Sequence, residues 1–142
     1  MFRAICKKKN EIDAEAAKAL LRSGRRGVLA VNGDDGYPYA IPINYVYDGY
    51  ARKIYFHGAR AGHKVDALRA CDKVCFTVYG GEFYKNGHWA PYVQSVLVYG
   101  RCRLVEDIAV TEARVRELRA SPRAAAFSPA RRGGRFSAFS WV

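Results

Sequence analysis

Two clusters of turn-forming residues divide the first half of the chain into three strand-like runs. The clusters Gly33-Asp34-Asp35-Gly36 and Asp48-Gly49 are rich in residues that tolerate the backbone angles of tight hairpin turns. They separate residues 27–32, 37–47 and 53–57, which are rich in β-branched and aromatic side chains. The pattern predicts a three-stranded antiparallel meander. It disfavours a doubly wound parallel fold, because parallel strands need long crossover connections.

The rest of the chain adds helices and further strands to this meander. Amphipathic spacing predicts three short helices, over residues 14–22, 63–70 and 108–119. Asp13 is placed to cap the first of them. Two more strands are predicted over 74–79 and 92–106, with a polar loop over 80–87 between them. This order of elements favours an antiparallel barrel that is mainly β with α additions.

A chain of 142 residues is long enough for one core and too short for two ordinary domains. We expect one domain over residues 1–119 and an atypical, disordered basic tail over 120–142, because the tail lacks strand or helix periodicity. The net charge of +11 raises the possibility of nucleic-acid binding. Seven arginines lie from residue 111 onward, so much of the excess charge belongs to the tail, and nucleic acid is disfavoured as a partner.

Several classes of protein are disfavoured by what the sequence lacks. No run approaches the roughly 20 apolar residues of a membrane helix, and the basic N-terminus is not followed by the apolar stretch of a secretory signal. We therefore expect a cytoplasmic protein that does not engage a membrane. The four cysteines lack the paired spacing of a zinc site, so we expect reduced thiols and no metal. No Ser-His-Asp or paired-carboxylate arrangement indicates a hydrolase.

A glycine-rich basic loop follows the third predicted strand. It runs from Phe56 to Val65, with the sequence Phe-His-Gly-Ala-Arg-Ala-Gly-His-Lys-Val, and opens a predicted helix. Glycines let backbone amides approach an anion, and a helix start with Lys64 and His63 favours negative charge, so the loop is a candidate phosphate cradle. An ordinary flexible turn with solvated basic residues explains the same pattern equally well.

Prolines interrupt the second predicted strand. Pro38 and Pro42 cannot donate to a ladder, so this strand should lie at an edge or carry a bulge. Backbone amides beside Pro42 could then face a ligand, although a simple edge strand is the plainer interpretation. Among other residues, His88 and Trp89 could contact a substrate, and Tyr79, Tyr84 and Tyr92 could stack on one, but exposed loop and strand-end positions explain them as well.

Several of these segments together resemble a known family. Residues 33–49, 53–59 and 62–68, continued by 73–76 and 92–101, are similar to the pyridoxamine phosphate oxidase-like flavin-binding split barrels, especially the branch with nitroimidazole-resistance reductases. The resemblance covers roughly residues 1–107. It implies a six-stranded antiparallel split β-barrel, although residues 120–142 show no pattern of the family's closing strand.

The resemblance also implies a site. Flavin mononucleotide (FMN) would lie between the two subunits of a homodimer, with Pro42, Ile43 and Asn44 along its ring. The ribityl phosphate would be held by the segment that contains four candidate residues, His57, Gly58, His63 and Lys64. Ser95 would reach the cofactor from the partner chain.

The implied activity is reduction or oxidation of a small molecule, with the flavin carrying the redox chemistry and His57 or a nearby tyrosine orienting the substrate. The arginine and histidine clamp of true pyridoxamine phosphate oxidases is not evident. A haem- or deazaflavin-binding relative, and a non-catalytic flavin- or nucleic-acid-binding module, stay open as alternatives.

Overall fold

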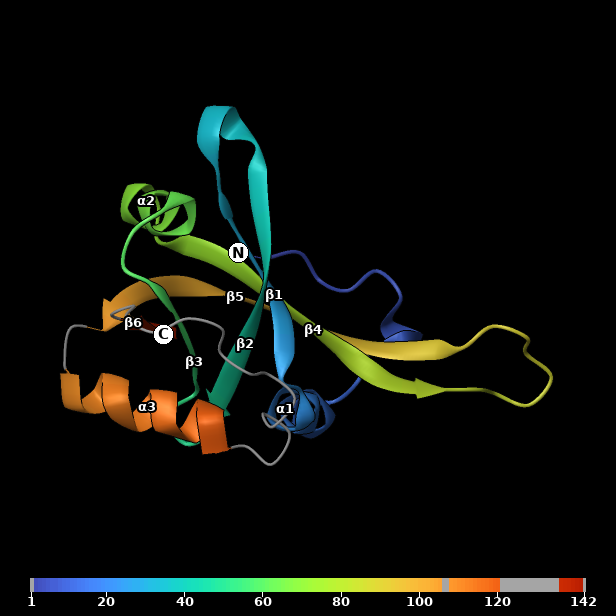
Figure 1. The fold of residues 1–142 in the computed structure, drawn as a ribbon. Helices are drawn as coiled ribbons and strands as arrows, with labels where there is room; N and C mark the ends of the chain where they lie inside the picture. Colours follow the sequence, from blue (N-terminus) through green and yellow to red (C-terminus); the bar gives the residue numbers. More distant parts are fainter. Residues whose placement is uncertain (1, 106–107, 121–135, 142) are drawn as a thin grey trace.

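The computed structural model describes residues 2–105, 108–120 and 136–141 (Figure 1). The strands are β1 (Arg26–Asn32), β2 (Pro38–Asp48), β3 (Lys53–Ala59), β4 (Lys73–Phe83), β5 (Tyr92–Val105) and β6 (Phe136–Trp141). The helices are α1 (Ala14–Ser23), α2 (His63–Ala70) and α3 (Ile108–Ala120), and two short 3-10 turns are η1 (Lys8–Asn10) and η2 (Asp34–Gly36).

The strands form an antiparallel barrel in the order β1-β2-β3-β6-β5-β4. In β1, and in β4 as far as Val78, alternate residues point inward, and the largest fully buried side chains, Phe56, Phe76, Leu29 and Val78, fill the centre. The meander predicted from the two turn clusters is confirmed, since β1 pairs with β2 and β2 with β3.

The three helices of the described residues pack against the barrel. Asp13 caps α1 as predicted, accepting a hydrogen bond from the backbone N–H of Ala16 at 2.8 Å. Leu20 and Leu21 of α1 are buried in the core. Helix α2 lies beside the upper part of β1, and α3 lies along β2 and β3 (Figure 1). No described helix is long and apolar enough to cross a lipid bilayer.

The mainly β fold with helical additions, of the split-barrel type, is confirmed, and two sequence expectations need correction. The polar loop expected over 80–87 is wrong at its start, because β4 continues to Phe83, which pairs with Tyr92 of β5. The tail expected to be disordered contains β6, which pairs with β3 on one side and β5 on the other. The rest of the tail, residues 121–135 and 142, lies outside the described residues.

Candidate functional site

Strands β2 and β3 separate halfway along β2. Residues Tyr45–Asp48 of β2 pair with Lys53–Phe56 of β3, whereas 38–44 pair with β1 and, among the described residues, with no strand on their other side. Beyond Phe56, strand β3 keeps its pairing with β6, which lies on its other side, and no longer pairs with β2. The divergence leaves an open edge of β2, defined here as residues 38–44, facing the loop that leads into α2.

The register of β1 and β2 shows which backbone groups face this open edge. The N–H of Tyr45 donates to the carbonyl of Arg25 at 3.1 Å, and the N–H of Gly33 donates to the carbonyl of Tyr37 at 2.8 Å. Both of these β2 residues, Tyr45 and Tyr37, have odd numbers. Hydrogen-bonded pairs recur at every second residue of an antiparallel ladder, so the odd-numbered residues of β2 are the ones that bond to β1. The backbone groups of the even-numbered residues, including Ala40 and Asn44, therefore point away from β1 toward the open edge.

Both prolines occupy even-numbered positions of β2, so neither removes a hydrogen bond from the ladder with β1. The predicted edge position is confirmed. The side chains of Pro42 and Asn44 are exposed, while Ile43 is buried in the core and its backbone pairs with Gly27 of β1. Of these three predicted cofactor contacts, Ile43 is thus the least able to offer a polar group to a ligand.

The glycine-rich loop and the start of α2 lie across from the open edge. Gly62 precedes the helix at a φ of +117°, an angle that side chains rarely adopt, and a Cβ added there would meet no atom within 4 Å. The backbone at the helix start is therefore accessible to a ligand. His63, the first residue of α2, stacks on Tyr39 of β2 with ring centroids 4.2 Å apart. Its Nε2 lies 3.3 Å from a carboxylate oxygen of Asp34.

Lys64 points into the barrel from the first turn of α2. It is half-buried, and its Nζ lies 5.6 Å from the centroid of the Phe56 ring. Burial lowers the pKa of Lys64 below its usual value, and the nearby Cys102 side chain partly opposes this. A cation held in such a partly desolvated place is stabilised by any anion that comes within reach.

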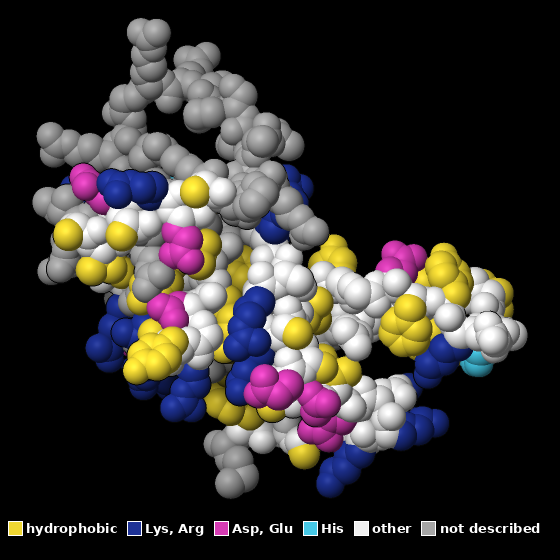
Figure 2. Space-filling model, turned by 90° about the horizontal axis from the view of Figure 1, so that it is seen from below, with side chains coloured by type: hydrophobic (Ala, Val, Ile, Leu, Met, Phe, Trp, Pro, Cys, Tyr) yellow, Lys and Arg dark blue, Asp and Glu magenta, His cyan; other side chains and the backbone are white. Residues whose placement is uncertain are grey.

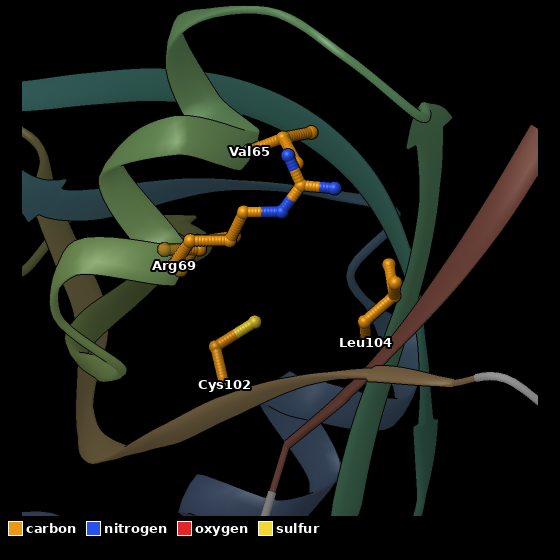
Figure 3. A pocket seen from close by; sticks show the side chains of 5 residues that line it. Val65, Arg69, Cys102 and Leu104 are labelled. Carbon is orange, nitrogen blue, oxygen red and sulfur yellow. The ribbon is translucent and has the colours of Figure 1, made fainter.

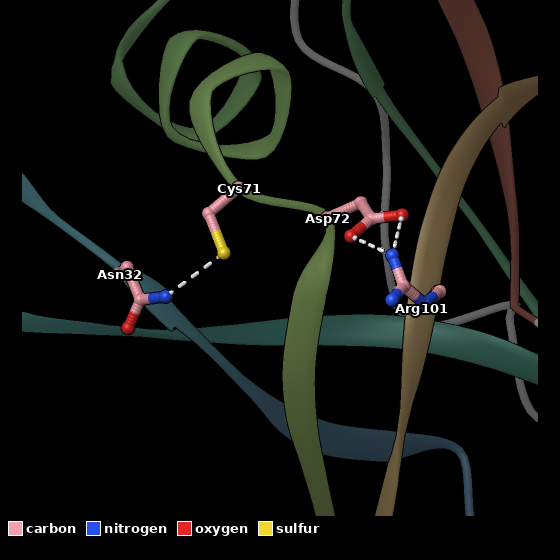
Figure 4. A network of polar contacts seen from close by, with 4 residues as sticks. All are labelled: Asn32, Cys71, Asp72 and Arg101. Atoms are coloured by element: carbon pink, nitrogen blue, oxygen red, sulfur yellow. Dashed lines mark hydrogen bonds and ion pairs between the residues drawn. The ribbon is translucent and has the colours of Figure 1, made fainter.

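The other end of α2 is fixed by polar contacts with two strands (Figure 4). The side-chain amide of Asn32 donates to Sγ of Cys71 at 3.1 Å, and Arg101 donates to both carboxylate oxygens of Asp72 at 2.9 and 3.0 Å. The carbonyl of Asp72 also accepts from the N–H of Cys102 at 2.7 Å. These contacts tie the end of the helix to β1 and β5, so its start keeps a defined position beside the open edge.

The predicted residues His57 and Gly58 lie on β3, where it pairs with β6. Both are partly buried, and Nδ1 of His57 is inaccessible to solvent. His57 directly follows Phe56, the core residue whose ring lies 5.6 Å from Nζ of Lys64, so this part of β3 lies close to the first turn of α2.

Ser95 is exposed on the outer face of β5, at a distance from the other candidates within one chain. The strands that carry Asn44 and Ser95 are separated by β1 and β4 in the sheet, a spacing of about 14 Å at 4.8 Å per strand. Within one chain these two residues cannot hold the same end of a small ligand. The sequence prediction that Ser95 acts from a partner chain is compatible with this placement and stays a prediction.

A small pocket lies on another side of α2, between this helix and β5 (Figure 3). Its volume is about 80 Å³, and it is lined by Val65, Leu68, Arg69, Cys102 and Leu104. Burial raises the pKa of the Cys102 thiol to about 12, so the thiol stays protonated at neutral pH. The pocket is much smaller than the roughly 300–1,000 Å³ of typical ligand sites, and none of the predicted cofactor contacts lines it.

Comparison with known proteins bears directly on this arrangement. The sequence profile of the pyridoxamine 5'-phosphate oxidase family matches residues 13–134. The chain belongs to this family. The match extends past residue 107, where the resemblance visible by inspection ended. Among curated proteins, none shows significant similarity to the chain.

Solved structures share the family's fold at low sequence identity. A Bacteroides thetaiotaomicron protein described as a candidate 5-nitroimidazole antibiotic resistance protein is 14% identical, with a TM-score of 0.68 over 92% of this chain and 86% of that one. An FAD-binding protein from Mesorhizobium loti is 21% identical, with a TM-score of 0.63 over 91% and 95%. A flavocytochrome from Azotobacter vinelandii is 22% identical, with a TM-score of 0.69 over 92% and 63%.

Sequence reasoning missed two features of the site. The stacking of His63 on Tyr39 and its contact with Asp34 join α2 to the β1–β2 hairpin, and they involve residues far apart in the sequence. The apolar rows on the outer face of β2, β1, β4 and β5 were not predicted either, because they arise only when these four strands pair in register. A signal for the rows was present in the alternation of Val93, Leu97 and Tyr99.

Proposed function

We propose that this chain binds FMN at the open edge of β2 and acts, as a homodimer, in the reduction or oxidation of a small molecule. The observation that carries the proposal is the divergence of β2 from β3, which opens the outward backbone groups of Ala40 and Asn44 on a strand whose Tyr39 contacts the start of α2. The flavin-binding relatives of similar fold and the family membership support a flavin as the ligand.

The residues at the two ends of the open edge suit different parts of the cofactor. The start of α2 offers the accessible backbone of Gly62, the helix dipole and the Lys64 ammonium, all of which favour a phosphate. The edge from Ala40 to Asn44 offers backbone donors and acceptors to the polar rim of a ring. When bound, a flavin supplies hydride or electron transfer, and His57 would orient the substrate.

The proposed homodimer uses the outer face of the sheet formed by β2, β1, β4 and β5. Two cross-strand rows on this face consist almost entirely of apolar or small residues: Ala40, Ala30, Cys75 and Tyr99 in one, and Pro42, Val28, Thr77 and Leu97 in the other. Leu97 and Tyr99 are 53% and 50% exposed in a single copy. A continuous apolar face of this kind favours association with a second copy.

A twofold axis between β1 and β4, parallel to the strands, would set β2 of one copy opposite β5 of the other. Continuing the β1–β4 register by two residues aligns Asn44, Arg26, Tyr79 and Ser95 in one row. Ser95 of one copy would then approach Asn44 of the other. This geometry supports a cofactor site that each subunit completes for its partner.

The decisive experiment is to purify the protein and identify any small molecule that it releases on denaturation. Mass spectrometry should find FMN, and the native protein should absorb near 450 nm, roughly the band of oxidised flavin. Light scattering should give the mass of two chains, about twice 15.9 kDa. A colourless protein that does not take up added FMN would overturn the cofactor, and a monomer at micromolar concentration would overturn the shared site.

The same experiment separates the alternatives. Release of haem would favour a haem-binding relative, for which the structural similarity to a flavocytochrome is the supporting observation. Release of a deazaflavin would favour the alternative that the chain is a deazaflavin-binding relative. A cofactor-free protein that retards nucleic acid on a gel would favour a binding module that uses its positive charge.

A further inference from the structure

An arm rich in aromatic residues extends from the barrel where β4 and β5 run on beyond the sheet. We define this aromatic arm as residues 80–92, and its aromatic members are Phe83, Tyr84, Trp89 and Tyr92. Trp89 is 94% exposed and Tyr84 is 65% exposed. Figure 2 shows hydrophobic side chains and a histidine gathered on this projection. So much aromatic surface on one short hairpin is characteristic of a contact surface.

Contacts within the arm give it a defined shape. The ring of Tyr92 stacks on the ring of Phe83, with centroids 5.7 Å apart. Nζ of Lys85 lies 4.4 Å from the centroid of the Tyr92 ring. The hydroxyl of Tyr92 lies 2.9 Å from Nδ1 of His88, and the N–H of His88 donates to the carbonyl of Lys85 at 3.0 Å. These contacts order the base of the arm, and the exposed Trp89 lies in the loop beyond it.

The arm extends away from the open edge of its own subunit. In Figure 1 it projects from the side of the barrel opposite α2, whereas the loop that leads into α2 borders the open edge. The arm as a whole therefore lies away from the cofactor site proposed for the same chain. A role for its exposed rings at such a site requires a second copy.

The proposed dimer places the arm beside the site of the partner. The arm follows directly from Ser95 along β5, and its base carries the exposed Val93 as a continuation of the apolar outer face. In the twofold arrangement Ser95 lies opposite Asn44, at one end of the open edge, whereas the ring of His63 at the start of α2 stacks on Tyr39, near the other end. The arm continues from Ser95 past the Asn44 end of the partner's open edge, so its base lies nearer to the proposed ring end of the cofactor than to the phosphate end.

We propose that the aromatic arm of each subunit covers the ring end of its partner's cofactor and that Trp89 and Tyr84 select planar, conjugated substrates by stacking. This inference rests on the proposed function. Two exposed rings provide flat apolar surface above the place where a substrate meets the flavin, and stacking favours acceptors such as quinones and nitroaromatic compounds. His88, held by Tyr92, supplies a polar group beside them.

Mixed dimers test whether the arm acts on the partner. The chain has two tryptophans, so a Trp141→Phe background leaves Trp89 as the single tryptophan. In the first mixture, one subunit keeps Trp89 and carries Lys64→Met, and the other carries Trp89→Phe with Lys64 intact. FMN is added at a concentration that fills only the intact site. We expect strong quenching of Trp89 fluorescence, because the filled site lies beneath the partner's arm.

The reciprocal mixture is the control. Here the subunit with Trp89 keeps Lys64, and its partner carries both Trp89→Phe and Lys64→Met. We expect weaker quenching, since the filled site lies under the arm that lacks tryptophan. Equal quenching in the two mixtures, or the reverse order, would overturn the inference about the arm. The proposed function would still hold in that case if flavin absorbance showed that the protein takes up FMN. Absence of FMN uptake by the unmixed protein would overturn both.

A substrate comparison tests the selectivity. Reduced flavoprotein is mixed with menadione, a planar quinone, or with ferricyanide, which has no ring to stack. Trp89→Ala and Tyr84→Ala should each lower the ratio of the menadione rate to the ferricyanide rate by about three- to tenfold, the size of one aromatic contact. The matched control, Tyr37→Ala, removes an exposed ring at the far hairpin and should leave the ratio unchanged. An unchanged ratio in the arm variants would contradict stacking.

Discussion

Replacing Lys64 with methionine should lower the affinity for FMN without lowering the stability of the folded apoprotein. Methionine keeps an unbranched apolar stem over Phe56 and removes the charge. A charge-assisted contact to a phosphate contributes roughly 1.5–3 kcal/mol, so the affinity for FMN should fall by about ten- to a hundredfold. His63 is already engaged by Tyr39 and Asp34, which limits how far it can take over the role.

The stability of the apoprotein should change in the opposite sense. Burial lowers the pKa of Lys64, which means that the folded protein disfavours the charged form relative to water. The variant should therefore unfold at an equal or higher temperature at neutral pH. Because the folded pKa lies below the unfolded one, the wild-type apoprotein should gain stability as the pH rises from the folded pKa toward 10.5, and the variant should lack this gain.

Titration of the apoprotein with FMN and with riboflavin shows whether a loss of FMN affinity comes from a lost phosphate contact or from a disturbed fold. Riboflavin lacks the phosphate, so its affinity should be nearly unchanged in Lys64→Met. The control Lys9→Met removes one exposed positive charge from η1 and should affect neither ligand. An equal drop for both ligands would mean that Lys64 supports the fold, and no drop for FMN would refute its assignment to the phosphate.

Three further substitutions or truncations test the fold. Gly27→Ala should destabilise the protein by about 1–3 kcal/mol in urea unfolding, because the added Cβ would overlap the Phe76 ring; an unchanged midpoint would contradict the packing. Tyr45→Phe should cost about 1–3 kcal/mol, since the buried hydroxyl donates to the Leu21 carbonyl at 2.8 Å, and a neutral effect would show that water replaces it. Truncation after Ala120 removes β6 from between β3 and β5 and should abolish cooperative thermal unfolding, whereas an intact transition would show that the barrel does not need this strand.

The sequence predicted best those parts of the fold that depend on local chemistry. The glycine and aspartate clusters specify the hairpins between β1, β2 and β3, and Asp13 specifies the start of α1. The closing strand β6 could not be found in this way. Its sequence, residues 136–141, mixes aromatic residues and serines without a clean alternation, and its position depends on pairing with two distant strands.

The candidate site was predicted in the same uneven way. Glycines and basic residues before α2 indicated an anion-binding loop, and the prolines of β2 indicated an edge. The direction of Lys64, toward Phe56 inside the barrel, was not predictable, because it depends on how α2 sits over the core. The length of β4 was underestimated since Gly80 and Gly81 suggested a loop, although both lie within the strand.

The prolines of β2 also have a consequence for the behaviour of the protein at high concentration. An unpaired strand edge is a template on which other chains can add strands and aggregate. Pro42 removes an outward donor from the middle of this edge, between the outward donors of Ala40 and Asn44. A continuous intermolecular ladder cannot form across that gap, whereas a small ligand can still use the donors on either side. Replacing Pro42 with valine would add the missing N–H donor and make the edge more prone to pair with strands of other chains and aggregate.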